Sequence, residues 1–297
     1  MATLKDVQTK ITAVKKTRQI TKAMNMVAAS RLRGAQTRME GFRPYAEKFS
    51  EVLASLSQKA DENISPLLVP REEIKKILVV LCTSDRGLCG GFNLNLIEMA
   101  EELINEKKAA GLEVAVEAFG KKGRDWCRKN KLTIADQHIG VIGGNFGFSI
   151  AAKTGRKLVD LFLNDAADEV YVIYSNFAGM GRQIPLVKQI LPIPPLEIIQ
   201  DEESTQDKPY MAEHLCEPSP EELLAELLPK SVYVQIYSAL LETSTSEHAA
   251  RMSAMDNATK ACNDMISDLT LAFNKARQAA ITAELMDIVG GAEALKG

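Results

Sequence analysis

The fold of this chain is decided near its end, by the sixty residues "KSVYVQIYSALLETSTSEHAARMSAMDNATKACNDMISDLTLAFNKARQAAITAELMDIV" (230–289), which include neither glycine nor proline. Pro229 precedes the stretch and two glycines follow it, which is the usual punctuation of a helix. A continuous helix of this length extends about 90 Å, whereas helices of globular domains average about 11–12 residues. The sequence therefore predicts a helix over 230–297 that is too long to be enclosed in one domain of this size.

A second long helix is predicted at the start of the chain, over residues 1–66. Alternating steps of three and four residues from 4 to 56 meet an apolar side chain at thirteen of sixteen positions. That spacing is typical of the buried seam of a coiled coil. The three polar positions are neighbours in the seam, Arg18, Thr21 and Asn25, so we expect a polar interruption of the helix pair there.

The matching seam of the C-terminal helix is expected to start at Ala254. The same steps from Ala254 to Met286 meet alanine at seven of ten positions. Alanine permits a close approach of two helices but buries little apolar area per residue. Because one helix begins the chain and the other ends it, we expect a long antiparallel two-helix coiled coil, with a globular domain inserted between its helices.

Strand-like and helix-like stretches alternate between residues 72 and 200. Such alternation predicts an inserted, Rossmann-like α/β domain with a largely parallel sheet. A run at 184–193 contains prolines and is expected at the sheet edge, and residues 201–229 are read as a loop and connection that starts with polar turn formers. The expected strands are 74–83, 112–120 and 168–177, and the expected helices are 92–110, 121–130 and 149–164.

One glycine-rich loop has the layout of a phosphate-binding turn. The segment "CTSDRGLCGGFN" (82–93) follows an apolar run and precedes a helical one. It lacks the Lys-Ser/Thr ending of a Walker A motif, and the chain has no GxGxxG. A tight turn is therefore the alternative, served by the backbone freedom of Gly87, Gly90 and Gly91. From these residues a nucleotide-binding enzyme with coiled-coil arms stays open, although the three histidines form no evident catalytic group.

Charge is unevenly distributed along the chain. The formal net charge is −3, yet residues 1–48 hold eleven Lys or Arg against three acidic residues. A solvated helix face or an acidic partner explains such a segment, while nucleic-acid binding is disfavoured because aromatic residues are not interleaved with the basic ones. Five cysteines without CxxC spacing indicate a reducing compartment. No apolar run approaches the roughly 20 residues of a membrane-spanning helix, so membrane association is expected only through a partner.

Three parts of the chain carry the sequence patterns of one family. They are "VKKTRQITKAMNMVAASRLRGA" (14–35), "SDRGLCGGFN" (84–93), and the C-terminal pair "SEHAARMSAMDNATKACNDMI" (246–266) and "FNKARQAAITAELMDIVGGAEAL" (273–295). Through these motifs, in order and over almost its whole length, the chain resembles the gamma subunit of the F-type ATP synthase. The resemblance implies a central rotor shaft that couples proton-driven rotation to conformational cycling of the catalytic beta subunits.

The resemblance also implies partners rather than catalysis. In this family the shaft stands inside a ring of three alpha and three beta subunits, and its globular end contacts the epsilon subunit and the c-subunit ring. No catalytic residue, cofactor, metal or nucleic acid is expected. The expected location is the cytoplasmic face of the bacterial plasma membrane, because no transit peptide precedes "TLKDVQTKI" (3–11). Only Cys216 lies between Ile198 and Pro218, so the redox insert of photosynthetic relatives is not expected.

Four residues of the last motif are expected at the contact with a beta subunit. Arg277 and Gln278 match family positions that contact a beta-subunit loop, and Arg offers a planar fork for carboxylates. Thr282 belongs to the same patch, with a Thr bonded to its own helix backbone as the alternative. Asp287 stands where the family usually has Glu, so its reach is shorter. From the residues alone, a solvated helix face is the alternative for such charges.

Four further residues are expected at other contacts that the resemblance implies. Arg251 matches a position that faces the ring, or pairs with Glu247 one turn earlier. Met24 matches a position near an acidic beta-subunit segment, or fills the helix seam. Arg31 stands where the family usually has Lys, so its charge is kept but its geometry is not. Arg86 is expected to touch the acidic beta segment, which makes its glycine-rich loop a bearing surface.

Overall fold

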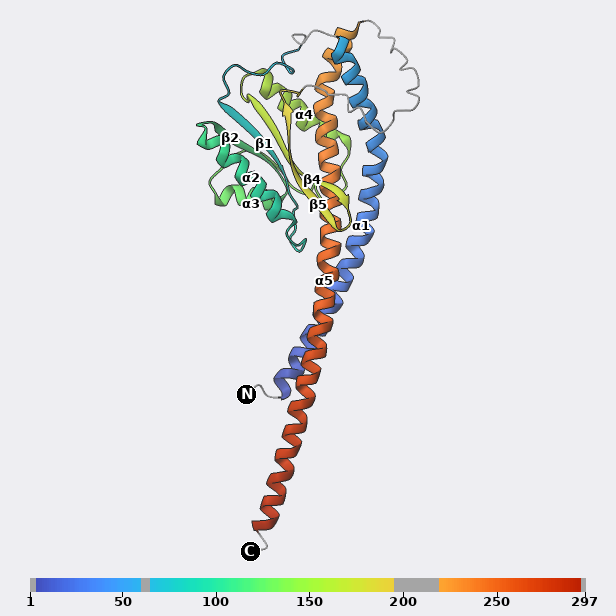
Figure 1. The fold of residues 1–297 in the computed structure, drawn as a ribbon, viewed down its shortest axis with the longest axis vertical. Helices are drawn as coiled ribbons and strands as arrows, with labels where there is room; N and C mark the ends of the chain where they lie inside the picture. The colour runs from blue at the N-terminus through green and yellow to red at the C-terminus, as the bar shows by residue number, and fades with distance from the viewer. Residues whose placement is uncertain (1–3, 60–64, 195–218, 295–297) are drawn as a thin grey trace, which may run out of the picture. The chain divides into compact units, whose positions relative to one another are not determined.

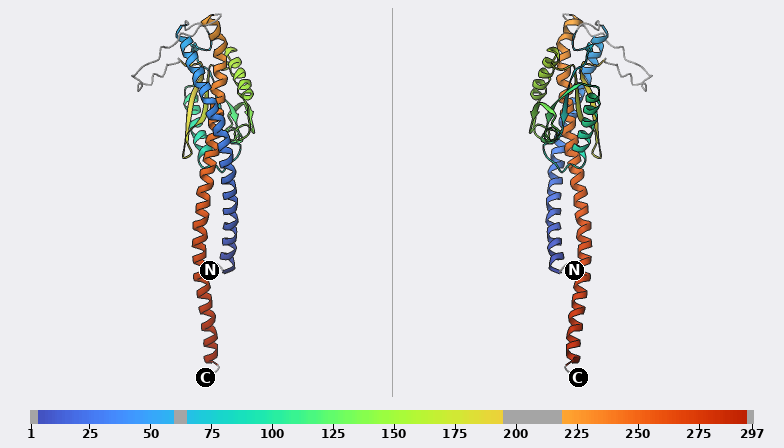
Figure 2. Two further views of the ribbon diagram at one scale, coloured as in Figure 1. Left: turned by 90° about the vertical axis from the view of Figure 1, so that its right-hand side faces the viewer. Right: turned by 90° about the vertical axis from the view of Figure 1, so that its left-hand side faces the viewer.

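The computed structural model describes residues 4–59, 65–194 and 219–294 (Figure 1). The chain divides into two compact units, which we call unit 1 (residues 1–30 and 251–297) and unit 2 (residues 31–250). Two long helices, α1 (Leu4–Lys59) and α5 (Pro220–Ala294), contribute to both units and lie side by side in each (Figures 1 and 2). The predicted fold class is confirmed, since long N- and C-terminal helices pack together and an α/β sheet is inserted between them in the sequence.

Helix α5 begins ten residues earlier than the expected start at residue 230. Its first turn is capped by Ser219, whose Oγ accepts a hydrogen bond from the backbone N–H of Glu222 at 3.2 Å. Ser-Pro-Glu-Glu is a capping-box sequence with proline at the first helical position. Pro229 lies inside the helix, where it removes one backbone hydrogen bond. The complete burial of Leu224 and Leu228 compensates for that loss.

Helix α5 also runs through the two glycines that follow the glycine-free stretch. Gly290 and Gly291 lie inside it, and the helix reaches Ala294. Glycine weakens a helix interior by up to about 1 kcal/mol relative to alanine, but it does not end a helix by itself. Because α5 begins at Pro220, residues 220–229 of the expected connection are helical. Residues 201–218 of that connection lie outside the described part of the chain.

In unit 1, α1 and α5 form an antiparallel pair. The predicted α1 seam, whose positions from residue 32 onward belong to unit 2, is confirmed. Every predicted seam position of α1 is buried or half-buried. The predicted alanine seam of α5 was wrong, because its positions 261, 265, 268 and 272 are exposed. Alanine-rich helices fit many registers, so the larger apolar side chains decide which face packs. Those that are buried or half-buried are Met252, Met255, Cys262, Ile266, Leu269 and Phe273.

Unit 2 contains a five-stranded sheet in the order β3-β2-β1-β4-β5. Neighbouring strands from β3 to β4 run parallel, and β5 pairs antiparallel with β4 at the edge, as its prolines predict. Strand β3 was not predicted, because its polar sequence TIADQH is nowhere fully buried at this edge. The strands are β1 (Lys76–Cys82), β2 (Glu113–Phe119), β3 (Thr133–His138), β4 (Glu169–Gly179) and β5 (Arg182–Leu191).

Helices cover both faces of this sheet. Helices α2 (Phe92–Ala109) and α3 (Lys121–Lys129) pack on one face, while α4 (Phe148–Leu163) packs on the other with the unit 2 parts of α1 and α5 (Figure 1). Strand β1 alternates between the two cores, which explains its continuous apolar sequence. Among the described helices, none combines the length and the apolar character that crossing a bilayer requires.

Candidate functional site

The end of α5 extends beyond the start of its partner helix. Arg18 Nη1 donates to Asn263 Oδ1 at 3.1 Å, and counting outward along the antiparallel pair places Leu4 opposite Arg277. Both figures of the whole fold show α5 continuing past α1 (Figures 1 and 2). All residues from 281 to 292 are exposed. We call residues 277–292 the terminal segment.

The terminal segment carries an exposed apolar stripe. Ile281, Leu285, Ile288 and Val289 follow the i, i+4, i+7, i+8 spacing of one helix face. Their exposed fractions lie between 49% and 68%, which is far above that of a packed seam. Exposed apolar surface of this kind marks a contact with a partner. The stripe was not predicted from the sequence, although its i, i+4, i+7, i+8 spacing is visible there.

Four predicted contact residues lie on the terminal segment. Arg277 and Gln278 are exposed one turn before the apolar stripe, on the same side of the helix. Thr282 is exposed, and its Oγ1 donates to the backbone oxygen of Gln278 at 2.9 Å, which is the backbone bond considered as its alternative. Asp287 is exposed among the apolar residues. All four side chains are therefore exposed on the stretch of α5 that extends past the described start of α1.

A band of polar contacts crosses the helix pair of unit 1. The hydroxyls of Thr21 and Thr259 lie 2.8 Å apart, next to the contact between Arg18 and Asn263. Asn25 Nδ2 donates to the backbone oxygen of Met252 at 2.9 Å. The polar interruption predicted in α1 is thus bonded across the pair, which satisfies polar groups at a seam.

The last of these bonds places two predicted contact residues at one level of the pair. Met24 precedes Asn25 on α1, and Arg251 precedes Met252 on α5. The bond between Asn25 and Met252 therefore places Met24 and Arg251 at about the same position along the axis of the helix pair. Both residues are half-buried. Met24 therefore has a packing role as well as an exposed edge.

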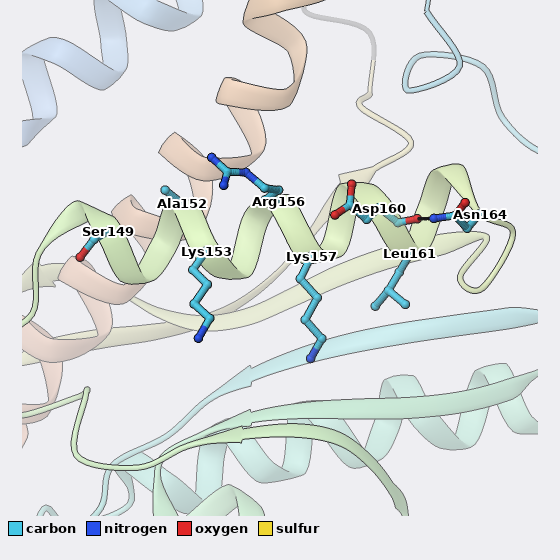
Figure 3. A pocket seen from close by; sticks show the side chains of 8 residues that line it. All are labelled: Ser149, Ala152, Lys153, Arg156, Lys157, Asp160, Leu161 and Asn164. Atoms are coloured by element: carbon cyan, nitrogen blue, oxygen red, sulfur yellow. Dashed lines mark hydrogen bonds between the residues drawn. The ribbon is translucent and has the colours of Figure 1, made fainter.

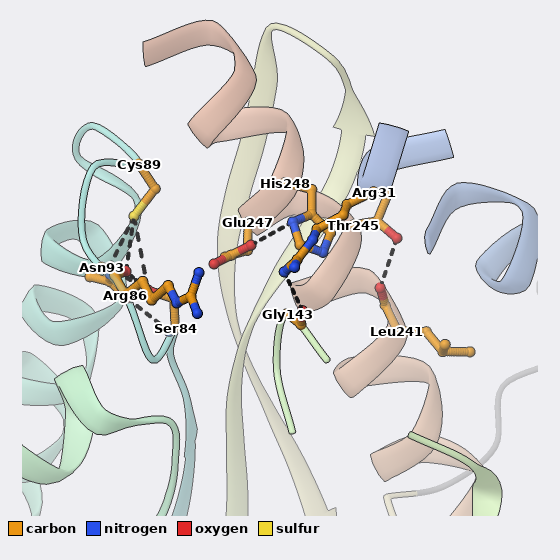
Figure 4. A network of polar contacts seen from close by, with 10 residues as sticks. All are labelled: Arg31, Ser84, Arg86, Cys89, Asn93, Gly143, Leu241, Thr245, Glu247 and His248. Carbon is orange, nitrogen blue, oxygen red and sulfur yellow. Dashed lines mark hydrogen bonds and ion pairs between the residues drawn. The ribbon is translucent and has the colours of Figure 1, made fainter. Parts of the chain in front are cut away.

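The other two predicted contact residues lie in unit 2. Arg31 Nη1 donates to the backbone oxygen of Gly143 at 3.3 Å, so part of its donor capacity is used within the chain. Arg86 is exposed in the loop before α2, and its side chain points toward Glu247 of α5 (Figure 4). Glu247 is only 2% exposed, and one of its oxygens lies 2.9 Å from His248 Nδ1. Arg31 and Arg86 thus face a polar network of their own chain.

The glycine-rich loop closes on its own side chains. Asn93 of α2 accepts a hydrogen bond from Ser84 N at 2.9 Å and donates one to Cys89 Sγ at 3.1 Å (Figure 4). Cys89 points into the core, whereas Leu88 is 63% exposed at a φ of 64°, which is unusual for a residue with a side chain. The loop is therefore held as a turn that presents Leu88 and Arg86 outward, and Asn93 occupies its interior.

One cluster of metal-type donors occurs among the described residues, at Glu117, Asp136 and His138. Lys157 of α4 reaches into it, with Nζ 2.6 Å from Asp136 and 3.5 Å from the fully buried Glu117. His138 Nε2 lies 2.7 Å from Glu117. The hydrogen bond from Lys157 lowers the pKa of Asp136 below its ordinary value. The ammonium group thus already supplies a cation, and the cluster joins β2, β3 and α4.

A shallow groove of about 490 Å³ lies along α4. Figure 3 shows that its charged side chains diverge, because Lys153 and Lys157 point to one side and Arg156 to the other. They do not converge on a point where a small anion would bind. The lining residues all belong to α4 or its end, and they are Ser149, Ala152, Lys153, Arg156, Lys157, Asp160, Leu161 and Asn164.

The described cysteines are buried free thiols. Burial raises the pKa of Cys127 to about 11 and raises the pKa of Cys82 further still, so both stay protonated and unreactive at neutral pH. Cys89 and Cys262 are buried as well. Cys216, on which the expectation about a redox insert depends, lies outside the described residues.

Comparison with known proteins gives one consistent result. A family model described as ATP synthase matches residues 3–295. The chain is 63% identical over 298 residues to the ATP synthase gamma chain of Desulfosudis oleivorans, with 100% of both chains covered, and 61% identical to that of Desulforapulum autotrophicum, with 99% of this chain and 100% of the relative covered.

Solved structures show the same likeness. The structure titled as the central stalk and c-ring of Tetrahymena thermophila mitochondrial ATP synthase contains a chain that matches with a TM-score of 0.58 and 25% identity, covering 80% of this chain and 99% of that one. A chain in the Euglena gracilis mitochondrial ATP synthase matches in fold with a TM-score of 0.66 at 19% identity, covering 98% of this chain and 94% of that one.

Proposed function

This chain belongs to the family of ATP synthase gamma chains, and on that premise we propose that it is the central rotor shaft of a bacterial F-type ATP synthase. It is a non-catalytic subunit of that enzyme. Rotation of the c-subunit ring turns the shaft, and the shaft changes the nucleotide affinity of the catalytic beta subunits in sequence. Coupling of this kind needs contacts whose free energy differs between the states of the partner.

The partners follow from this role. We propose that unit 1 contacts the ring of three alpha and three beta subunits, and that unit 2 contacts the epsilon subunit and the c-subunit ring. The chain then reaches the cytoplasmic face of the plasma membrane only through this complex. No cofactor, metal or nucleic acid is part of the proposal.

The terminal segment is the single observation that carries the proposal. A helix that leaves its partner and exposes an apolar stripe is costly in water, because apolar surface gains about 25 cal/mol per Å² when it is buried. Enclosure in a sleeve formed by other subunits removes that cost. Seven of its sixteen residues are Gly, Ala or Thr, and such small side chains suit a surface that turns inside its partner.

We further propose where the directional contacts lie. Arg277 and Gln278 bond a beta-subunit loop, supported by their exposure beside the apolar stripe. Thr282 and Asp287 belong to the same contact surface. Arg251, with Met24 at the same level of the helix pair, faces the ring further along the shaft. Met24 and Arg86 contact the acidic beta segment, and Arg31 brings a positive charge to a further subunit contact, where its bond to Gly143 uses part of its donor capacity.

Reconstitution tests the proposal. The chain is mixed with the alpha and beta subunits of its own source, and the assembled complex is isolated and assayed for ATP hydrolysis. We expect one copy per three alpha and three beta subunits and a higher turnover than without it. A chain that ends at Ala276 lacks the terminal segment and the five residues after it. It keeps the pairing with α1, and it should assemble poorly. Equal turnover with and without the full chain would refute the proposed role.

A further inference from the structure

The middle of α5 buries six consecutive polar residues, at positions 243–248. Their exposed fractions are between 0 and 2%. Upstream, the same helix buries Val232, Ile236 and Leu240 at successive turns. Burying polar groups costs free energy unless they are bonded, so a helix that only filled the core would continue with apolar residues. The polar residues at 243–248 therefore have a role other than filling the core.

Two of these residues bond the backbone of β4 at Ser175. Ser175 N donates to Thr243 Oγ1 at 3.3 Å, and Ser246 Oγ donates to Ser175 O at 3.2 Å. Thr243 and Ser246 are three positions apart, so they lie on one face of the helix. Strand β1 pairs with β4 no further than Ile173, and the β5 partner of Ser175 is Pro185, which has no N–H to donate. Helix α5 thus bonds β4 at a residue where the neighbouring strands provide fewer hydrogen-bond partners.

We propose that Thr243 and Ser246 are positioning residues that fix α5 along and about its axis against the sheet, so that torque reaching the α/β domain is passed to the shaft helix. Apolar contacts are non-directional and tolerate sliding, whereas hydrogen bonds weaken steeply when their distance or angle changes. Helix α5 is continuous from Pro220 to Ala294, so a rotation imposed at Ser175 is carried along the same helix. This inference rests on the proposed function as a shaft.

A third contact on the same side of α5 supports the proposal. Glu247 follows Thr243 by four positions and therefore shares its face. Its carboxylate lies over the loop between β3 and α4, where a Cβ built on Gly143 would be 3.6 Å from Glu247 Oε1. The side chain of Arg86 approaches from the glycine-rich loop (Figure 4). The polar face of α5 is thus held against the strand and two loops, rather than by packing alone.

The other half of the polar stretch provides a matched control. Thr245 Oγ1 donates to the backbone oxygen of Leu241 in its own helix at 2.9 Å. Ser244 Oγ has no hydrogen-bond partner among the described residues. Both are as deeply buried as Thr243 and Ser246. Ser244→Ala with Thr245→Val therefore removes the same atoms from the same helix as Thr243→Val with Ser246→Ala, without touching the bonds to the sheet.

The test uses the complete ATP synthase in liposomes. For the wild type and both double variants, we measure proton uptake per ATP hydrolysed and the melting temperature of the complex. We expect the ratio of pumping to hydrolysis to fall three-fold or more in Thr243→Val/Ser246→Ala, while the control pair keeps the wild-type ratio. Hydrolysis and melting temperature should change equally little in both pairs, which a merely structural role would not produce.

Two results would overturn the inference: wild-type coupling in both pairs, or equal loss of coupling in both. If the first pair does not assemble, Ser246→Ala is compared with Ser244→Ala, and equal ratios in these single variants overturn it as well. A wild-type complex that hydrolyses ATP without pumping protons would instead contradict the proposed function itself.

Discussion

The side-chain hydroxyls of Thr21 and Thr259 lie 2.8 Å apart across the helix pair, at a seam position that coiled coils usually fill with apolar side chains. Thr21 is 8% exposed, so the contact is shielded from water. Thr259 also bonds the backbone of its own helix, through Met255 O at 2.8 Å. A polar contact of this kind specifies the register of two helices at some cost in stability.

Removing one hydroxyl of this pair should cost more than removing both. Thr21→Val leaves Thr259 facing an apolar group, and we expect the free energy of unfolding to fall by about 1 kcal/mol. Thr21→Val combined with Thr259→Val replaces both partners by groups of the same shape, which is expected to be nearly neutral. Urea denaturation of the full chain measures both effects. If the losses of unfolding free energy in Thr21→Val and Thr259→Val simply add in the double variant, the contact does not contribute to stability.

Lys157→Met should destabilise unit 2, because it leaves the buried carboxylate of Glu117 without its lysine partner. Glu117 is completely buried, and Lys157 Nζ lies 3.5 Å from it. We expect a loss of about 1–2 kcal/mol, toward the low end because Lys157 is partly exposed. Lys153→Met is the matched control, since Lys153 is exposed one turn earlier on the same helix and points to the same side as Lys157 (Figure 3). Equal melting temperatures for the two variants would show that the pair contributes nothing.

The second ion pair of Lys157, with Asp136, should make stability depend on acidic pH. The hydrogen bond from Lys157 lowers the pKa of Asp136 in the folded state. Its contribution is therefore complete above the unfolded pKa of about 3.9 and is lost as the pH falls through the lower folded value. The stability difference between wild type and Lys157→Met should thus shrink below about pH 4. A difference that stays constant from pH 6 to pH 3 would contradict this origin.

Gly155→Ala and Gly41→Ala should have opposite effects on stability. A Cβ on Gly155 of α4 would lie 2.3 Å from Tyr233 Cδ1 of α5, so alanine forces the two helices apart at a cost of about 1–3 kcal/mol. A Cβ on Gly41 of α1 meets nothing within 4 Å, and alanine there should add up to about 1 kcal/mol through helix propensity. Thermal unfolding decides the signs, and destabilisation by Gly41→Ala would show that α1 needs flexibility there.

Arg277→Ala should slow ATP hydrolysis by the assembled complex without changing the stability of the free chain. Loss of one charged hydrogen bond, about 1–2 kcal/mol, corresponds to a rate reduction of roughly 5- to 30-fold. Gln278→Ala should act in the same direction and less strongly. Lys275→Ala, two residues earlier on the exposed helix, is the control. If all three variants hydrolyse ATP at the wild-type rate, Arg277 and Gln278 are not coupling residues.

The long elements could be predicted because they depend on patterns that extend over many residues. The α1 seam repeats through the whole helix, and β1 is apolar because both of its faces are buried. Strand β3 escaped prediction because an edge strand needs few apolar residues, and the packed face of α5 escaped because alanines match several registers. The early start of α5 is signalled by the capping sequence Ser-Pro-Glu-Glu at 219–222. It was not predicted, because Pro229 has the position typical of a residue that precedes a helix.

The internal polar contacts could not be predicted, because their partners are distant in sequence. Ser175 and Thr243 are 68 positions apart, and Lys157 meets Glu117 across 40. Residue type alone does not reveal which buried hydroxyl bonds the sheet and which bonds its own helix. The apolar stripe of the terminal segment is different, because its spacing can be recognised in the local sequence. Only the structure shows that these apolar side chains are exposed.

The most direct test of a rotating shaft is to observe its rotation. A gold particle is attached through a cysteine at the exposed position of Lys153, in a chain with Cys216→Ser, and the alpha and beta subunits of the complex are fixed to glass. On addition of ATP we expect the particle to rotate in one direction, pausing at three positions per turn, one for each beta subunit. Sustained ATP hydrolysis with a particle that does not rotate would contradict the account.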